Sequence, residues 1–515
     1  MEWPIQKDDG KYSTTPTAKA VWKATIEAST ASPELKDRAL ASLAAAKNWR
    51  KQYIGALEDY MLLLVNTPAE DAIRMAEAGI EAVQTSMVFR HKDDDKTVSA
   101  RDAFFGSDDA VVPALDKTKV LSKPSNSDST GATEKPYRFS IASPNGDWLR
   151  GDGAKDQLKA WADYGAMEPS AADLASIVCK ANDCSSFVQD KVFVLLGATS
   201  SMGPAKTLLQ IPGAHVMAVA RDGKRLSSFM EWYEEHGAPG STLEIGPADL
   251  IGQGPSVAQW VVKTCRSHNK AVVLCSLIYM DGEAHVRAST AMDLIVDYTT
   301  VKLGANRVSL SYLSTPGLIF PVPPEAAKDA QSRHQKASSW QYLTSWVPGW
   351  LEPTNSWQKP GNICNALSSV QGPNYALAKM LQYWRCMVAA SSSKNGQVVS
   401  APMAPGSRTE SMVRYETVAS ALEGGQFFAP MLAFSVESAS SLMTAILLAQ
   451  MSRTGGPQVL AHPTHVVWDG SVHGGVFRVP YKMDSVGVAS YLLGKTVKAP
   501  YIPNDSVAQK DESNE

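Results

Sequence analysis

Short apolar runs alternate with helical patterns through the C-terminal part of the chain. From residue 190 onward these runs are KVFVLLG (191–197), AHVMAVAR (214–221), AVVLCSLIY (271–279), RVSLSYLS (307–314), QVVSAPMAP (397–405) and THVVWDG (464–470). Each run is nearly all apolar, which is typical of strands covered by helices on both faces. The pattern therefore predicts an α/β fold with a Rossmann-type, doubly wound parallel sheet.

The N-terminal part has a different texture, because helical patterns dominate at 32–90, 154–165 and 170–181. A chain of 515 residues, 44% of them hydrophobic, is long for one compact unit. We therefore expect a mainly helical N-terminal domain over 1–185 and a separate α/β domain over 186–495, which includes the segment 316–362. A polar stretch near 107–137 is expected to be a flexible loop, and 496–515 a polar tail.

Charge and cysteine usage narrow the class of protein. Lys and Arg number 49 against 52 Asp and Glu, giving a net charge of −3, so a nucleic-acid partner is not expected. The six cysteines contain no CxxC pair and indicate reduced thiols in an intracellular compartment. The N-terminus lacks a signal-peptide core, and no run approaches the roughly 18 apolar residues of a membrane span. We expect a soluble cytoplasmic or organellar protein; a processed transit peptide remains open.

The first strand runs into a turn of small residues before a helical stretch, LLGATSSMGPAKTLLQ. Such a turn lets the backbone approach a pyrophosphate at a helix N-terminus. The residues predicted to contact the cofactor here are Gly197, Thr199, Ser200, Ser201, Met202 and Gly203. Ser201 replaces the middle glycine of the usual fingerprint, and a purely structural turn is the alternative.

The second strand ends in Arg221, followed by Lys224, where an NAD-specific protein would carry an acid. Cations at this position suit the 2′-phosphate of NADP(H), and a solvated basic turn is the alternative. Asp249 and Leu250, after the third strand, and Ser276, which ends the fourth, are predicted to line the adenine and ribose side.

The helical stretch GPNYALAKMLQYWRCMV places Tyr375 and Lys379 four residues apart, on one face. An ammonium beside a phenol stabilises the phenolate and is expected to lower the pKa of Tyr375 toward the operating range, so Tyr375 could exchange a proton with a substrate oxygen while a hydride moves. A tyrosine packed in a helix interface is the alternative.

The order of these motifs, followed by VVSAPMAPGSRTESM and VVWDGSVHGG, resembles the short-chain dehydrogenase/reductase family over about 190–495. The resemblance implies that Tyr375 and Lys379 are the catalytic acid/base pair and that Lys379 also holds the nicotinamide ribose. It further implies that Pro405 and Gly406 pass beside the nicotinamide and that Thr409 contacts its carboxamide or the phosphates. Asp469 and Gly470 would belong to the last strand.

Two features depart from the family. Its catalytic serine normally ends the fifth strand about a dozen residues before the tyrosine, whereas Ser314, the best candidate, lies 61 positions before Tyr375. Ser311 is next, and Ser368 and Ser369 lie too close in sequence to the tyrosine. The family's helix asparagine has no counterpart in HVRASTAMDLIVDYTTVKLG, which leaves its proton relay in doubt.

An extra segment over 316–362 separates the fifth strand from the Tyr375 helix. It contains four tryptophans, Trp340, Trp346, Trp350 and Trp357. In this fold the segment would leave the sheet beside the nicotinamide, where the rings could form a lid over an apolar substrate. Packing against the N-terminal domain, a partner or a membrane surface is the alternative.

These features together predict an NADP(H)-dependent reductase, or the reverse dehydrogenase, acting on a carbonyl, hydroxyl or activated double bond of an apolar small molecule. An epimerase or dehydratase on the same scaffold, and a dinucleotide sensor or scaffold without turnover, remain alternatives. A homo-oligomer is compatible with the sequence. No metal is expected, because Pro463 separates His462 from His465, and no acidic or thiol cluster accompanies them or His473. His215, at a strand start, is expected to be buried.

Overall fold

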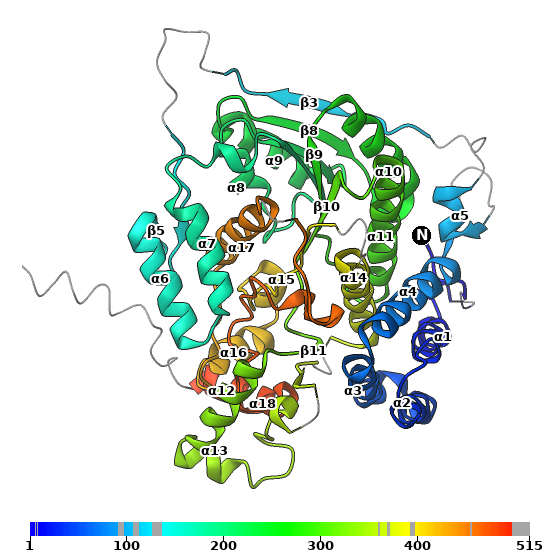
Figure 1. Ribbon diagram of the computed structural model, residues 1–515, viewed down its shortest axis with the longest axis vertical. Helices are drawn as coiled ribbons and strands as arrows, with labels where there is room; N and C mark the ends of the chain where they lie inside the picture. Colours follow the sequence, from blue (N-terminus) through cyan, green and yellow to red (C-terminus); the bar gives the residue numbers. More distant parts are fainter. Residues whose placement is uncertain are drawn as a thin grey trace, which may run out of the picture.

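A seven-stranded sheet forms the upper part of the molecule (Figure 1). The computed structural model describes residues 1–5, 7, 9–90, 97–106, 113–125, 136–358, 361–367, 371–391, 397–453 and 456–496. The strands of the sheet are β3 (Lys119–Ser122), β6 (Lys191–Leu196), β7 (His215–Ala220), β8 (Thr242–Pro247), β9 (Ala271–Ser276), β10 (Val308–Tyr312) and β13 (Val399–Ser400).

The strand order is β13-β10-β9-β6-β7-β8-β3. All neighbours are parallel except β3, which runs antiparallel to β8 at the edge. Numbered from β6 as the first, the parallel strands follow the order 3-2-1-4-5-6 of the Rossmann fold. The predicted α/β sheet is thus confirmed, and the order reverses between β6 and β9, where such sheets bind their ligands.

One face of the sheet is covered by helices from both halves of the chain. The elements on this side are α1 (Thr14–Glu27), α2 (Pro33–Ala45), α3 (Trp49–Asn66), α4 (Ala69–Ser86), β1 (Val88–Arg90), β2 (Thr97–Ser99), α5 (Ala100–Phe105), α10 (Leu250–Ser267), α11 (Glu283–Leu303) and α14 (Pro373–Ser391). Val192, Val194 and Leu196 of β6 face these helices and share one apolar core with them. The first four helices share this core: α1, α3 and α4 contact α14, α4 also contacts α11, and α2 packs on α1 and α3.

The opposite face packs against a second set of helices. These elements are β4 (Ile141–Ala142), β5 (Trp148–Leu149), α6 (Gly151–Tyr164), α7 (Pro169–Lys180), η2 (Ser185–Phe187), α8 (Ala205–Leu209), α9 (Lys224–His236) and α17 (Val436–Met451). Phe193 and Leu195, which alternate with the other β6 side chains, point into this core. Both faces of the sheet are therefore buried, as the nearly all-apolar strands predicted.

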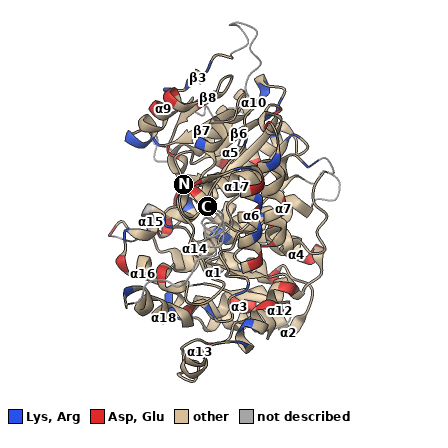
Figure 2. Ribbon diagram, turned by 90° about the vertical axis from the view of Figure 1, so that its left-hand side faces the viewer, with Lys and Arg blue, Asp and Glu red and all other residues tan. Residues whose placement is uncertain are grey.

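The segment between β10 and α14 and the C-terminal helices lie toward the lower end of the molecule (Figure 1). Their elements are β11 (Ile319–Pro321), α12 (Pro324–Gln335), α13 (Ser339–Thr344), η3 (Asn355–Trp357), β12 (Ile363–Asn365), α15 (Glu410–Val413), α16 (Glu416–Gly425), η4 (Pro463–Val467) and α18 (Met483–Thr496). Of these, β11, α12, β12 and η4 contribute apolar side chains to the core shared with the N-terminal helices, whereas α18 and the loops beside it form a third, smaller core. Leu351, Phe428 and Tyr481 are buried together there. Figures 1 and 2 place α13 at the lower end, away from the sheet.

The position of α13 tests whether the tryptophan-containing segment 316–362 forms a lid. Trp340 contacts Phe428, and Trp357 contacts His334. Trp346 is 73% exposed, on the protruding end of the molecule. Trp340 of α13 and Trp346, which follows the helix, therefore do not lie over the end of the sheet in this structure, and a lid function would require the segment to move.

Two predicted elements differ from the structure. The run 464–470 is not a strand: Pro463 begins the short helix η4, and the side chain of His462 accepts a hydrogen bond from the amide of Thr464. Proline cannot donate to a sheet ladder, and this local cap fixes a helical turn instead. Conversely, β3 lies inside the stretch expected to be a loop, where it pairs on one side only and leaves Val120 65% exposed.

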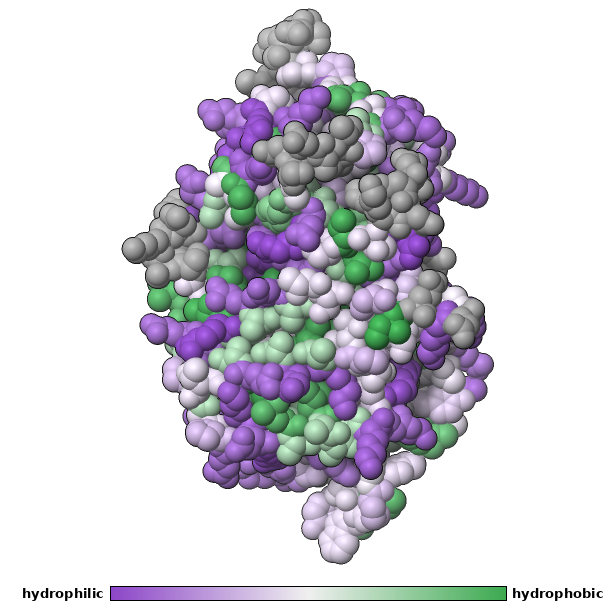
Figure 3. Space-filling view, turned by 90° about the vertical axis from the view of Figure 1, so that its right-hand side faces the viewer, coloured by the Kyte–Doolittle hydropathy of each residue, from purple (hydrophilic) through white to green (hydrophobic). Residues whose placement is uncertain are grey.

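Residues of both charge signs lie near one another along the described chain. Figure 2 shows acidic and basic residues interspersed along the ribbon on the side that faces the viewer. Figure 3 shows hydrophilic and hydrophobic residues mixed over the side formed by the N-terminal helices. Within the described ranges, no helix is both long and apolar enough to cross a membrane.

Candidate active site

Tyr375 and Lys379 lie on the first turns of α14, at the carboxyl end of β10. The Tyr375 hydroxyl donates a hydrogen bond to Oγ1 of Thr315, with 2.7 Å between the oxygens. Lys379 Nζ lies 3.1 Å from Oε1 of Gln382 and 3.5 Å from the carbonyl oxygen of Leu313. Both side chains are half-buried. The two residues therefore point at the sheet edge where Rossmann-type folds bind ligands.

Aromatic side chains surround the tyrosine. The ring of His285, from α11, stacks on the Tyr375 ring with centroids 5.6 Å apart, and Tyr279 meets it edge-on at 6.1 Å. The expectation that Lys379 lowers the pKa of Tyr375 is wrong for this structure, because burial in this setting raises that pKa above its usual value. The phenol is therefore protonated at neutral pH and can donate a proton.

Burial acts in the opposite direction on the lysine. Removing the ammonium from water lowers the pKa of Lys379 to about 8. Burial, reinforced by the charge of Lys379, also holds the pKa of His285 well below its usual range. The imidazole is therefore neutral, and its Nε2 has no hydrogen-bond partner within the described part of the chain.

A short chain of hydrogen bonds links Lys379 to Gln382 and to α11. Gln382 accepts from Lys379 through Oε1, and its Nε2 lies 3.4 Å from Oγ of Ser289 on α11. The α11 segment contains no asparagine at the position that the family resemblance implies. Gln382 and Ser289 instead supply hydrogen-bonding groups next to Lys379, and because they lie 93 residues apart no local sequence motif contains both.

The N-terminal helices fix the orientation of α14. Trp384 donates to the hydroxyl of Tyr60 on α3 at 2.8 Å and packs so closely on Gly79 of α4 that a Cβ there would lie 2.7 Å from the ring. Arg385, which is half-buried, forms an ion pair of 2.7 Å with the buried Asp293 of α11. These contacts lock the face of α14 opposite Tyr375, so the helical layer supports the candidate site.

The strand-end hydroxyl that meets Tyr375 belongs to Thr315, not to the predicted Ser314. Ser314 Oγ donates to the carbonyl oxygen of Ala401 at 2.9 Å, and so it is committed to the backbone. Ser311 lies buried within β10, while Ser368 and Ser369 lie outside the described residues. The sequence search looked for serine and missed the adjacent threonine, whose hydroxyl has the same hydrogen-bonding capacity.

The glycine turn follows β6 as predicted. Gly197 has φ of +100°, and a Cβ there would lie 2.5 Å from Cγ1 of Ile278, so only glycine fits. The amides of Thr199, Ser201 and Met202 donate no hydrogen bond within the described ranges, and Ser201 is exposed. These groups can receive an anion. The following helix, α8, has only five residues, so its dipole contribution is small.

Other members of the turn are less accessible. Ser200 and Met202 are half-buried, and Gly203 is buried, with its carbonyl accepting from Ser440 of α17. The hydrogen bond from α17 thus helps to hold the turn in place.

Arg221 and Lys224 lie exposed after the carboxyl end of β7. Neither forms an ion pair within the part of the chain that the structure describes, whereas Asp222 between them pairs with Lys117 at 3.0 Å. Two cations are thus available beside the end of the second strand.

The residues predicted for the adenine and ribose side divide into two groups. Asp249 is exposed at the start of α10, where its amide donates to Gln253. Leu250 and Ser276 are buried, at 2% and 4% exposure, and the Ser276 hydroxyl has no partner in the described residues. Asp249 is therefore accessible to a ligand in this conformation, whereas Ser276 is not.

The segment after β13 closes the same edge. Pro405 is buried, Gly406 accepts from the amide of Phe434 at 3.0 Å, and Thr409 is half-buried. Beyond them Arg414 forms an ion pair of 2.9 Å with Asp281 in the loop after β9. This exposed pair connects two loops above the ends of β9 and β13.

Little free space is present beside Lys379. A cavity of about 10 Å³ is lined by Ser314, Thr315, Leu318, Phe320, Lys379, Gln382, Tyr383, Met403 and Val467. This volume holds roughly one water molecule. Tyr375 is not among the lining residues, so this cavity lies beside the lysine and not at the tyrosine hydroxyl.

The three C-terminal histidines each contact other groups of the protein. His465 stacks on Trp468 at 3.6 Å, and His473 lies 3.1 Å from a carboxylate oxygen of Glu168. His462 contacts the carbonyl oxygen of Thr67. Each is thus engaged in packing or hydrogen bonding.

No protein-family model matches the chain, and a search of curated proteins finds no relative. Among solved structures, the chain is similar to an NADPH-dependent 3-quinuclidinone reductase from Rhodotorula rubra at 12% identity, covering 57% of this chain and 94% of that one, with a TM-score of 0.34. An L-sorbose reductase from Gluconobacter frateurii, complexed with NADPH and L-sorbose, matches at 16% identity, covering 56% and 97%, also with a TM-score of 0.34. A 3-oxoacyl-[acyl-carrier protein] reductase from Brucella melitensis in complex with NAD matches at 11%, covering 56% and 97%, with a TM-score of 0.33. The similarity is distant, so the fold assignment rests on the strand order.

Proposed function

We propose that this chain is an NADP(H)-dependent oxidoreductase of the short-chain dehydrogenase/reductase type. The observation that carries the proposal is the placement of Tyr375 at the carboxyl end of β10, hydrogen-bonded to Thr315 and followed one turn later by Lys379. Its substrate is a fairly apolar small molecule with a carbonyl, a hydroxyl or an activated double bond.

The cofactor would lie across the ends of β6 and β9, where the strand order reverses. The free amides of Thr199, Ser201 and Met202 are suited to the pyrophosphate, and Arg221 with Lys224 to the 2′-phosphate. When bound, the nicotinamide supplies or accepts the hydride. Pro405, Gly406 and Thr409 would border the ring side, with Asp249 toward the adenosine.

In the reductive direction, Tyr375 gives its proton to the substrate oxygen. Its raised pKa keeps the phenol protonated, and Lys379 stabilises the phenolate that remains after transfer. Before a substrate is bound, Oγ1 of Thr315 accepts a hydrogen bond from the Tyr375 hydroxyl. Once a substrate is bound, its oxygen can accept hydrogen bonds from both hydroxyls. Gln382 and Ser289 hold the lysine in place.

A second candidate function is a dinucleotide sensor or scaffold without turnover. The short helix α8 favours this alternative, because its dipole contributes little to the usual pyrophosphate site.

The deciding experiment has two stages on the full-length chain. Titration with NADPH and with NADH, followed by nicotinamide fluorescence, should show tighter binding of NADPH. A panel of apolar ketones, aldehydes and enones should then give substrate-dependent oxidation of NADPH. Binding without oxidation of NADPH by any compound would favour the sensor, and absence of binding to either cofactor would refute both functions.

A further inference from the structure

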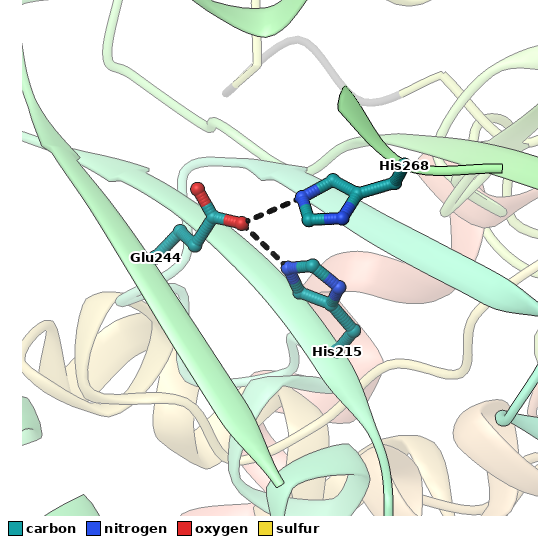
Figure 4. Close-up of side chains that lie close together, drawn as sticks. All are labelled: His215, Glu244 and His268. Carbon is teal, nitrogen blue, oxygen red and sulfur yellow. Dashed lines mark hydrogen bonds and ion pairs between the residues drawn. The ribbon is translucent and has the colours of Figure 1, made fainter. Parts of the chain in front are cut away.

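Three side chains converge at the amino edge of the sheet, opposite the edge that carries Tyr375. One carboxylate oxygen of Glu244 lies 2.7 Å from Nε2 of His215 and 3.0 Å from Nε2 of His268 (Figure 4). One ligand atom from each residue lies within 4.8 Å of the other two. The sequence suggested only a buried His215, because the three positions are far apart in the chain.

The scaffold explains why they meet. His215 begins β7, and Glu244 stands on the neighbouring parallel strand β8, two residues after the partner of His215, so both side chains project from the same face. His268 follows the end of α10. The guanidinium of Arg307 donates to the carbonyl oxygens of Cys265, His268 and Lys270, which fixes the turn that carries His268. All three ligands therefore stand on ordered backbone.

The donor set has the chemistry of a transition-metal site. Two imidazole nitrogens and one carboxylate oxygen are ligands that zinc accepts, whereas calcium and magnesium prefer oxygen alone. The two rings stand almost perpendicular, at 87°, so their Nε2 atoms approach the carboxylate oxygen from different directions. Zinc–nitrogen and zinc–oxygen bonds of about 2.0–2.2 Å would require only a small outward movement of these atoms.

Burial favours a bound cation at this place. His215 is 5% exposed and Glu244 is 8% exposed, whereas the side chain of His268 is 29% exposed. A buried carboxylate benefits from a compensating charge. The exposed side of His268 leaves an approach for the ion and for a water molecule as the fourth ligand.

We propose that His215, Glu244 and His268 bind one divalent transition-metal ion of the zinc class. The site stands independently of the proposed oxidoreductase function. The six residues of β7 separate its two ends by roughly 17 Å, so the ion would not touch a substrate at Tyr375. Its role would be to tie the loop after α10 to β7 and β8.

The test uses the full-length chain after exhaustive dialysis against a chelator, with Zn²⁺ and Co²⁺ as the probes. Wild type should take up one zinc per chain by elemental analysis. Co²⁺ should give visible absorption bands of a four-coordinate site, and micromolar Zn²⁺ should raise the thermal midpoint by several degrees. His268→Ala should bind Zn²⁺ at least about 10-fold more weakly, because one of three protein ligands is lost.

Two further variants keep the result interpretable. His236→Ala removes an exposed histidine of α9 that lies outside the cluster and should bind zinc like wild type. Glu244→Gln keeps the size of the side chain and should weaken binding if His268→Ala fails to fold. Absence of zinc uptake by wild type at 100 times the protein concentration would overturn the proposal, as would equal affinity in wild type and either ligand variant. The cluster would then be a hydrogen-bonded triad only.

Discussion

The hydroxyl of Tyr375 donates to Oγ1 of Thr315, which lies three residues beyond the end of β10. This hydrogen bond joins the proposed acid on α14 to the end of the fifth parallel strand. It crosses 60 residues of sequence, including the segment with α12 and α13. The insertion therefore leaves the relation between strand and helix intact.

The first prediction concerns the threonine. Thr315→Val keeps the shape of the side chain and removes the acceptor, so kcat should fall about 10²-fold because the phenol loses its orientation. Ser314→Ala is the matched control, since that hydroxyl donates to the carbonyl oxygen of Ala401 and not to Tyr375. Steady-state oxidation of NADPH checks both. The opposite ranking of the two variants would reassign the role to Ser314.

A second prediction follows from the lowered pKa of Lys379. The folded amine loses its proton near pH 8, whereas the unfolded side chain keeps it to about 10.5. Between these values the unfolded state binds more protons, so the contribution of Lys379 to the free energy of unfolding rises with pH. Urea denaturation at pH 7.5, 9 and 10 should show wild type gaining stability relative to Lys379→Met.

The comparison with Lys379→Met is necessary because other groups titrate in the same window. Lys51→Met, at an exposed position of α3, is the control and should keep the pH dependence of wild type. If the free energy of unfolding changed with pH in the same way for wild type and Lys379→Met, the Lys379 ammonium would not be desolvated in the folded protein.

The third prediction tests cofactor choice. Arg221→Ala should raise the Kd for NADPH about 10-fold and leave that for NADH nearly unchanged, because only NADPH carries the 2′-phosphate. Arg38→Ala removes a surface arginine that pairs with Asp59 on the N-terminal helices and serves as the control. Fluorescence titration measures both constants. An equal rise in the Kd for NADPH and for NADH would show that Arg221 contacts a part of the nucleotide that both cofactors share.

The fourth prediction concerns the turn after β6. Gly197→Ala places a methyl group 2.5 Å from Ile278 at a positive φ, so it should destabilise the fold by about 1–3 kcal/mol. It should also weaken NADPH binding because the turn must shift. Gly487→Ala, in α18 with no atom within 4 Å of the new Cβ, should be neutral or slightly stabilising. Denaturation curves and NADPH titration distinguish the two glycines.

The sequence predicted the parallel sheet well because each strand buried on both faces is a nearly continuous apolar run. It failed where local signals were weak or misleading. Strand β3 carries Lys119 and Ser122 and pairs on one side, so it resembles a loop. The run after Pro463 resembles a strand in composition, yet the cap formed by His462 begins a helical turn.

The candidate site was predictable only in part. Tyr375 and Lys379 share a helix, and their spacing is visible in the chain. Thr315, Gln382 with Ser289, and the cluster of His215, Glu244 and His268 depend on contacts between distant elements. Strand register and helix packing bring these residues together, and a single sequence contains no local record of either.

The central claim, that Tyr375 gives a proton while NADPH is oxidised, is tested most directly by Tyr375→Phe. The variant keeps the ring and its stacking on His285 and loses only the hydroxyl. With a substrate found in the carbonyl panel, it should bind NADPH with an unchanged Kd and oxidise it at least about 10³-fold more slowly than wild type. Oxidation at the wild-type rate would contradict the account.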